Sequence, residues 1–349
     1  MKNKKYLDIW TARLIGAESD KEFRAKLDKN TETKLRETVM FCRNNSIYYK
    51  ELYDGLEIPE DNFMKWFETL PFSTPEDARE RHMDFICVRP GDISRVVTIN
   101  TGGSTGKPKR VHFTQEDQQL TVDFFHNGMQ LIVDATDKVM ILMPAKVPGS
   151  IGLLLSEALH GFGAQTVEYG LPDMFPGRDG SDEEVERILK IIAEENVTSV
   201  VALPTHMRML AEKAHGHKLK SVLLSAEYVS DENMQFIGET FGCKMYEHYG
   251  MTEMGLGCAV SCGYGEGYHV RESDLYIEII DPETGVPVPE GEIGEVVFTT
   301  LTRKGMPFVR YRTGDYSRWI TEQCACGSQL KRLAKVGPRA VVKGYLKKE

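Results

Sequence analysis

The sequence predicts an α/β fold in which mostly parallel, doubly wound sheets carry helices on both faces and adjoin a smaller antiparallel, barrel-like module. Two observations support this prediction. Between residues 94 and 255, short apolar runs alternate with helical stretches, and repeated β-α units of this kind build a parallel sheet covered on both faces. After residue 255 the helical pattern stops, and turn-rich segments separate extended stretches.

The 349 residues are enough for a large core, and we divide them into three parts. Residues 1–93 form the helical N-terminal part of a large domain. Residues 94–255 form its α/β core, and residues 256–349 form the β-rich, barrel-like module. In the first part, composition predicts helices at 21–27, 33–44 and 63–70, the last ending before Pro71.

The core contains the clearest alternation of strands and helices. Polar residues before helical stretches predict N-caps at Thr114, Ser181 and Ser230. Ligands of such folds bind at the carboxyl ends of parallel strands. We expect strands at 95–99, 138–143, 164–167, 199–202, 221–224 and 244–247, and helices at 115–133, 151–160, 182–195, 205–215 and 231–241.

The third part reads as strands at 275–280 and 294–300, separated by the turn-rich segment DPETGVPVPEGE, with a further extended stretch at 308–319. No crossover helix separates these strands. Antiparallel pairing is therefore expected here rather than another parallel unit.

Composition and charge exclude several classes of protein. The net charge of −9 provides no basic stripe for nucleic acid, and no apolar run is long enough to span a bilayer. The start, MKNKKYLDIW, has no apolar core of the kind a signal peptide needs, so we predict a cytoplasmic protein. In that compartment the seven cysteines are thiols, metal ligands or nucleophiles rather than disulfides.

A glycine-rich loop, TGGSTGKPK at residues 101–109, follows the first core strand. Glycine lets the backbone approach a ligand closely, and free N–H groups, hydroxyls and lysines on one loop suit a polyphosphate. A Walker A loop would need glycine at Thr101 and serine or threonine at Pro108, so this loop is not one. The alternative is a glycine-rich surface turn.

Three further segments join the loop: SAE at 225–227, YEHYGMTE at 246–253 and YRTGD at 311–315. Together the four motifs resemble the adenylate-forming superfamily of acyl-CoA synthetases, and most closely its phenylacetate–CoA ligase branch. The segment TTLTRKGMPFVRYRTGD is very similar to that branch, whereas Gly102 replaces a serine and Ser225 replaces a glycine of the superfamily. The likeness spans residues 94–337.

The resemblance implies a site for ATP and Mg²⁺. In it, Glu253 would hold Mg²⁺, Thr252 would touch the α-phosphate, and Asp315 would accept hydrogen bonds from the ribose hydroxyls, roles that suit carboxylates. Arg312 has two open interpretations, a phosphate contact or a structural ion pair. The implied catalytic residues are Lys109, Thr252 and Glu253, and the implied nucleotide-binding residues are Thr101, Gly103, Ser104, Thr105, Gly106, Lys107, Ser225, Ala226, Glu227, His248, Tyr249, Gly250, Arg312 and Asp315.

The acyl pocket of the family lies between the helix after the glycine loop and the segment around residues 144–151. The candidates are Phe124, Phe125, Val147 and Gly149, with His126 and His248 as further wall residues. An apolar pocket suits an aromatic or aliphatic acid without choosing between them.

Four residues form a candidate zinc site: Cys262, His269, Cys324 and Cys326. Thiolates and imidazole suit tetrahedral Zn²⁺. The spacing is not that of a zinc finger, but similar pairs occur in the phenylacetate–CoA ligase branch, where they imply a structural zinc. Reduced side chains that hold no metal are the alternative, and Cys258 is a spare ligand.

The resemblance predicts ATP-dependent adenylation of a small aromatic or aliphatic carboxylic acid with release of pyrophosphate, and transfer to CoA or a protein acceptor. The smaller C-terminal lid domain of the superfamily is expected to be absent, since the sequence ends at Glu349. A non-catalytic protein that sequesters nucleotide or an acyl ligand, or a subunit that needs a partner-supplied lid, is the alternative. The oligomeric state is open, with a homodimer as one form.

Overall fold

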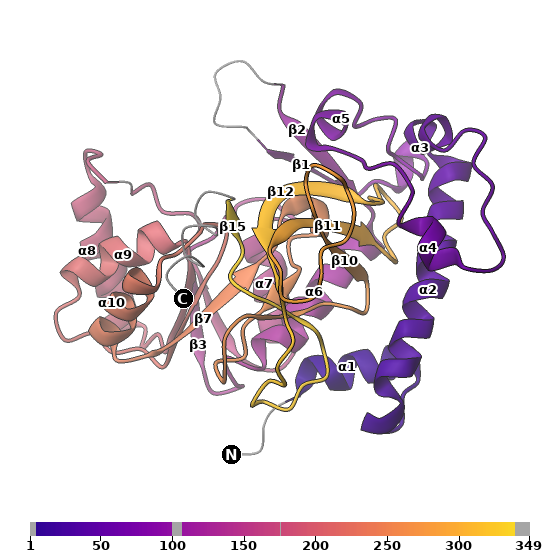
Figure 1. Cartoon of the computed structure of the whole chain (residues 1–349). Helices are drawn as coiled ribbons and strands as arrows, with labels where there is room; N and C mark the ends of the chain where they lie inside the picture. Colours follow the sequence, from indigo (N-terminus) through magenta and orange to yellow (C-terminus); the bar gives the residue numbers. More distant parts are fainter. Residues whose placement is uncertain (1–4, 100–106, 175, 339–349) are drawn as a thin grey trace.

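The computed structural model of the chain describes residues 5–99, 107–174 and 176–338. Its largest element is a nine-stranded sheet in the order β13-β14-β9-β8-β7-β6-β5-β3-β4. Strands β4, β3, β5, β6 and β7 are parallel, and β8, β9, β14 and β13 extend the sheet by antiparallel pairing. A four-stranded antiparallel sheet, β10-β11-β12-β15, and the hairpin β1-β2 complete the β-structure of the described residues (Figure 1).

The helices of the described residues are α1 (Tyr6–Ile15), α2 (Asp20–Asn45), α3 (Ile47–Leu52), α4 (Phe63–Phe67), α5 (Pro75–Glu80), α6 (Gln115–Met129), α7 (Ile151–His160), α8 (Ser181–Glu194), α9 (Pro204–Lys213) and α10 (Asp231–Phe241), with short 3-10 helices η1 (Pro90–Asp92) and η2 (Thr252–Met254). Among them, none is both long enough and apolar enough to cross a lipid bilayer.

The strands are β1 (Arg95–Ile99), β2 (Lys109–Phe113), β3 (Lys138–Ile141), β4 (Gln165–Glu168), β5 (Ser199–Ala202), β6 (Ser221–Leu224), β7 (Lys244–Tyr249), β8 (Ala259–Val260), β9 (Tyr268–Val270), β10 (Leu275–Ile280), β11 (Gly294–Thr300), β12 (Tyr311–Ser317), β13 (Trp319–Ile320), β14 (Arg332–Leu333) and β15 (Gly337–Pro338).

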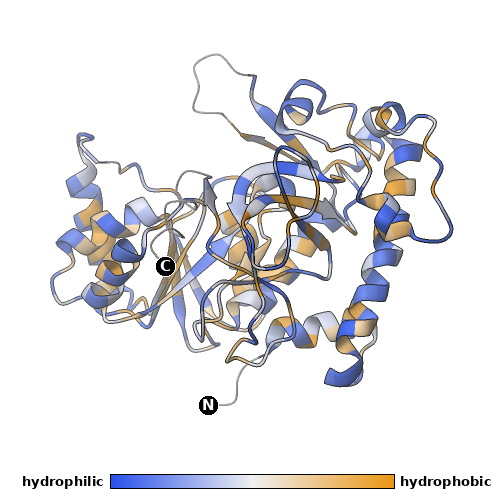
Figure 2. Cartoon of the chain, in the orientation of Figure 1, coloured by the Kyte–Doolittle hydropathy of each residue, from blue (hydrophilic) through white to orange (hydrophobic). Residues whose placement is uncertain are grey.

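Alternating side chains bury both faces of the parallel strands. In β6, Leu223 packs with the cluster formed by α1, α6 and α7, while Val222 and Leu224 pack with the cluster formed by α8, α9 and α10. This is the period-two pattern of a doubly covered strand. Figure 2 shows apolar residues gathered in the strands and on the inner sides of these helices. The predicted α/β class is confirmed.

The strands of the third part are divided between two sheets. Strands β10, β11, β12 and β15 form the smaller antiparallel sheet, whereas β8, β9, β13 and β14 lengthen the large one. The smaller sheet packs through Ile277, Val296 and Phe298 against a core that also contains Leu35 and Tyr49 of the N-terminal helices. The first 93 residues therefore support the sheet that carries the YRTGD motif.

Two of the three predicted N-caps are confirmed. Thr114 Oγ1 accepts a hydrogen bond from the Asp117 amide (3.1 Å), and Ser230 Oγ accepts one from the Asn233 amide (3.3 Å). The third was wrong: Gly180, with φ of 79°, is the cap of α8, and Ser181 is its first residue. The two predicted helices at 21–27 and 33–44 are one helix, α2.

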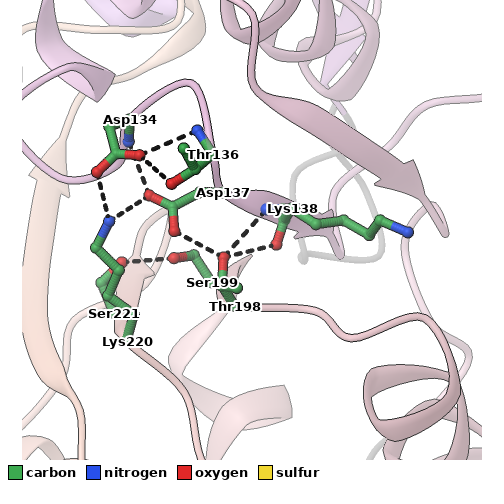
Figure 3. A network of polar contacts seen from close by, with 8 residues as sticks. All are labelled: Asp134, Thr136, Asp137, Lys138, Thr198, Ser199, Lys220 and Ser221. Carbon is green, nitrogen blue, oxygen red and sulfur yellow. Dashed lines mark hydrogen bonds and ion pairs between the residues drawn. The ribbon is translucent and has the colours of Figure 1, made fainter.

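At the amino-terminal ends of β3, β5 and β6, a polar network joins the strands (Figure 3). Lys220 Nζ pairs with Asp134 (2.9 Å) and with Asp137, whose other oxygen accepts a hydrogen bond from Thr198 Oγ1 (2.9 Å). Ser199 and Ser221 are hydrogen-bonded at 2.8 Å. The opposite, carboxyl ends of the same strands are free to face the candidate site.

Candidate functional site

The glycine loop connects β1 to β2, and its predicted residues Thr101, Gly103, Ser104, Thr105 and Gly106 lie outside the described residues. Its flanks are defined, because Ile99 pairs with Lys109 in the hairpin. Lys107 Nζ lies 2.5 Å from Glu80 Oε2 on α5, with both side chains exposed.

A buried cluster joins Lys109 on β2, Glu253 in η2 and Tyr311 on β12. Lys109 Nζ forms an ion pair with Glu253 and lies 3.3 Å from the Tyr311 hydroxyl, which donates to Glu253 Oε1 at 3.0 Å. Glu253 is 1% exposed and Lys109 is 9% exposed. Burial, and the charge of Glu253, raise the pKa of the Tyr311 hydroxyl, so it remains a proton donor.

Thr252 and Gly250 flank Glu253 in the turn after β7. Thr252 begins η2 and is partly buried. A Cβ on Gly250 would lie 2.8 Å from the Gly257 Cα, so glycine is required for this turn to close against the following segment. The turn aims the Glu253 carboxylate at Lys109.

Beside this cluster, a cleft with about 750 Å³ of empty space brings predicted nucleotide-binding residues together. Ala226, Glu227, Tyr249, Gly250 and Asp315 all line it. The Tyr249 hydroxyl donates to Asp315 Oδ2 at 3.0 Å. Motifs separated by up to 90 residues therefore share one cavity.

The acidic residues of this cleft have distinct surroundings. Burial raises the pKa of Asp315, and nearby Glu253 and Glu295 raise it further, whereas the Tyr249 hydrogen bond lowers it. Glu227 is held at the start of α9, where its Oε2 accepts from the Thr205 amide (3.1 Å) and hydroxyl (2.6 Å). Ala226, which precedes Glu227 in the wall of the cleft, adopts a φ of 71°, a left-handed conformation that strains a residue with a side chain.

An apolar pocket of about 440 Å³ adjoins the cleft, between α6, α7 and the carboxyl ends of β5–β7. It contains four predicted residues, Phe124, Phe125, Ser225 and His248, and otherwise hydrophobic side chains. Val147 and Gly149 do not line it. Val147 is 49% exposed, and Gly149 lies against Arg95 and Gln118. His126 instead packs against Phe162.

His248 lies on the boundary, because it lines both the apolar pocket and the cleft. Its Nδ1 is 2.9 Å from Ser225 Oγ, and its buried Nε2 has no hydrogen-bond partner among the described residues. Burial and the charge of Arg271 lower the pKa of His248 to about 4, so its ring is neutral at pH 7.

Arg312 forms an ion pair with Glu295 on β11, with Nε 3.0 Å from Oε2, and Nη2 donates to the Pro282 carbonyl at 3.0 Å. Of its two interpretations, the structural ion pair is therefore present in the structure. A phosphate contact stays a prediction.

The four predicted metal ligands come together at the far end of the large sheet. Cys262, His269, Cys324 and Cys326 are buried, and their ligand atoms lie within 4.8 Å of one another. The Cys262 and Cys324 Sγ atoms are 3.5 Å apart, and Cys326 Sγ is 3.3 Å from His269 Nε2. Cys258 is buried in the separate hydrophobic core.

Sequence reasoning placed Tyr311 in the YRTGD motif without giving it a role, and it missed the wall formed by Val336, Gly337 and Pro338, which closes the cleft beside Asp315. Tyr311 carried a detectable signal, because strand residues four apart share a face and Asp315 was already a candidate. The wall carried none, since the pairing of β15 with β12 at Asp315 depends on tertiary packing.

Comparison with known proteins agrees with this geometry. The model of the AMP-binding enzyme family matches residues 44–301, which is most of the chain. This chain belongs to the AMP-binding enzyme family. The adenylate-forming resemblance deduced from the four motifs is thereby confirmed.

Curated relatives of this AMP-binding enzyme include phenylacetate–coenzyme A ligases of three bacteria. The Thermus thermophilus protein is 26% identical over 90% of this chain and 70% of its own length. The Pseudomonas putida protein is 28% identical over 77% and 60%, and the Escherichia coli protein is 26% identical over 82% and 66%. The matches thus cover only part of each relative.

Solved structures show the same fold. A 2-hydroxyisobutyryl-CoA ligase in an open conformation, in complex with 2-HIB-AMP and CoA, superposes with a TM-score of 0.79 at 19% identity, over 93% of this chain and 75% of that chain. The structure of the same ligase in its thioesterification state has a TM-score of 0.79 at 21% identity, over 90% and 68%.

Proposed function

We propose that this AMP-binding enzyme activates an apolar carboxylic acid with ATP and passes the acyl group to CoA. An oxygen of the acid attacks the α-phosphorus, the bond from that phosphorus to the bridging oxygen breaks, and pyrophosphate leaves. The supporting observation is that the Lys109–Glu253 cluster, the Tyr249–Asp315 cleft and an apolar pocket adjoin one another. The phenylacetate–CoA ligase relatives support the same reaction.

In this proposal, different residues bind the adenosine, the acid and the phosphates. Tyr249 and Asp315 seat the adenosine, with Asp315 accepting the ribose hydroxyls. Phe124 and Phe125 seat the body of the acid. Lys109 neutralises phosphate charge, so that catalysis consists of positioning and charge stabilisation.

Magnesium is part of this proposal, and Glu253 is the residue that would hold it. Glu253 is a buried carboxylate beside Lys109, the residue assigned to the phosphates, and Mg²⁺ binds through one or two carboxylates together with phosphate oxygens. The cation supplies charge neutralisation for the polyphosphate when bound.

We further propose that the Cys262, His269, Cys324 and Cys326 cluster holds a structural zinc ion. Tetrahedral ligands at the usual Zn–S length of about 2.3 Å stand about 3.8 Å apart, close to the two separations in this cluster. His269 Nδ1 lies 3.4 Å from the Leu330 carbonyl, an arrangement that leaves Nε2 as the ligand atom. Free thiols at these positions also agree with a cytoplasmic protein.

The experiment is exchange of labelled pyrophosphate into ATP, measured with Mg²⁺ across a panel of aromatic and aliphatic acids. We expect exchange that depends on the acid, and CoA-dependent release of AMP with the same acid. Absence of exchange with every acid, alongside tight binding of nucleotide, would favour a sequestering protein instead.

A further inference from the structure

Helix α5 lies next to the Lys109 cluster and carries an arginine. It belongs to the N-terminal part of the chain, where the sequence indicated no site residue. Helix α5 packs against β2, which carries Lys109, and against β12, which carries Tyr311. The backbone fixes this position, because Ser73, just before the helix, accepts from the Arg312 amide (3.0 Å) and donates to the Arg310 carbonyl (3.1 Å). The Thr74 N-cap then starts the helix.

Arg79 lies near the end of this helix and has an unusual environment. The Arg79 side chain is partly buried, and its Nε is buried. Among the described residues, this nitrogen has no hydrogen-bond partner and the side chain forms no ion pair. A buried, unpaired guanidinium nitrogen costs free energy unless a ligand satisfies it. The positive charge reaches the cluster, because it lowers the pKa of the Tyr311 hydroxyl, whereas burial, Glu253 and Asp77 raise it.

The two lysines near Arg79 already have ion-pair partners. Lys109 is balanced by Glu253, and Lys107 by Glu80. Asp77 Oδ2 already accepts from the Tyr48 hydroxyl (3.0 Å) and from the Thr74 amide (3.0 Å) and hydroxyl (2.6 Å). Asp77 keeps its negative charge but forms no ion pair with Arg79 in the described part of the chain. Arg79 is therefore a cation without an ion-pair partner there, beside the cluster that the proposed function assigns to phosphate.

We propose that Arg79 is a phosphate-binding residue, which contacts the β- and γ-phosphates of ATP next to Lys109 and stabilises the departing pyrophosphate. This inference rests on the proposed function, since it assigns a further contact to the same ATP site. A guanidinium fork is suited to the role, because it can make two parallel hydrogen bonds to phosphate oxygens.

The test compares Arg79→Met and Arg79→Lys with wild type by calorimetric titration of ATP with Mg²⁺, of pyrophosphate and of AMP. AMP lacks the β- and γ-phosphates. We expect Arg79→Met to weaken ATP and pyrophosphate binding about tenfold or more, the value of one charge-assisted hydrogen bond, and to leave AMP affinity unchanged. Arg79→Lys should restore part of the affinity.

The matched control is Arg81→Met at the C-cap of the same helix, because Arg81 pairs with Glu51 (2.7 Å) and Asp84 (2.8 Å) at the surface. It should leave all three affinities unchanged. Unaltered ATP affinity in Arg79→Met, or an equal loss of AMP affinity, would overturn the inference. These titrations contain no acid, so a protein that fails the exchange assay but shows the selective loss refutes adenylation and retains the role of Arg79. A wild type that binds no ATP refutes both.

Discussion

At the scale of single residues, the site contains a buried ion pair between Lys109 and Glu253. Both charges are buried, so removing either partner leaves the other without compensation. The pair also neutralises the site before nucleotide arrives. In the proposed reaction, Mg²⁺ would take the place of Lys109 beside Glu253, and the phosphates of ATP would take the place of Glu253 beside Lys109.

Glu253→Gln should lower pyrophosphate exchange by about 100-fold or more, because the amide keeps the shape of the side chain and loses its charge. AMP affinity should change little, since the proposed function assigns adenosine binding to Tyr249 and Asp315. Tyr311→Phe is the matched variant: it removes one donor to Glu253 and should cost less. Exchange rates with saturating ATP test both, with thermal melting to verify folding. Unchanged exchange in Glu253→Gln would contradict the assignment.

Asp315 gives the binding of AMP a predictable pH dependence. The raised pKa means that the carboxylate takes up a proton at a higher pH than usual, and the protonated form accepts ribose hydroxyls less well. AMP affinity should therefore begin to fall at a higher pH than the ordinary pKa of an aspartate would give. Tyr249→Phe removes the hydrogen bond that lowers this pKa and should move the fall to higher pH. Titrations from pH 5 to 8 measure it.

The control for that experiment is Tyr264→Phe, at an exposed position outside the cleft, which should leave the pH curve unchanged. A Tyr249→Phe curve that coincides with wild type would mean that Asp315 does not control the response.

His248 should make the protein less stable as pH falls from about 6.5 to about 4. Its pKa in the folded protein is lowered to about 4, so the unfolded chain binds more protons in this interval and stability is lost. His248→Asn should flatten this part of the curve in urea unfolding. Burial also lowers the pKa of His112 to about 4. Because both proteins contain His112, the difference between their stability curves reports the contribution of His248 alone. If the stability of wild type and of His248→Asn changed with pH by the same amount, His248 would not be the cause of the loss.

At the scale of elements, the network in Figure 3 fixes the amino-terminal ends of three parallel strands. Lys220→Met should destabilise the protein by about 1–2 kcal/mol, because Asp137 is 3% exposed and loses its cation. Lys138→Met removes an exposed pair with Glu195 and should cost below about 1 kcal/mol. Denaturant unfolding compares them, and equal losses would contradict the ranking.

Prediction from sequence worked best for elements defined by local signals. The strands at 199–202 and 221–224 and the helix at 151–160 have the predicted bounds, since apolar runs and flanking polar residues define them within a few positions. The predicted start of α8 was wrong by one residue. Gly180, which adopts positive φ readily, is the N-cap, and Ser181 is already the first helical residue. Helix α2 continues through Asp28 and Lys29 and joins two packing faces, with Leu27 in one core cluster and Leu35 in another. The sequence between these faces has no buried residue and so gave no signal of one continuous helix.

At the scale of the whole molecule, the candidate site could be predicted in part because three of its motifs lie at strand ends. The pairing of strands after Gly255 could not be, since short strands such as β8 and β14 have no pattern that selects one sheet over another. Arg79 was missed for a related reason. Its significance comes from α5 meeting β2 and β12, a contact between distant segments.

The zinc proposal also concerns the whole molecule, because the cluster ties β8 and β9 to the segment between β13 and β14. The purified protein should contain about one equivalent of zinc per chain, and chelation should lower its melting temperature. Cys326→Ser should lose the metal, whereas Cys243→Ser, at a cysteine outside the cluster, should retain it. Elemental analysis measures the zinc content. A wild-type protein that is purified without zinc and melts at the same temperature with and without added zinc would refute the proposal.

The shared position of His248 has a consequence for protein engineering. His248 lines both the apolar pocket and the cleft, which the proposed function assigns to the acid and to the adenosine. A mutation that enlarges the pocket at this residue should therefore also reshape the cleft. Libraries selected for new acids should therefore yield useful variants at Met129 and Leu155, which line the apolar pocket alone, and reject most changes at His248.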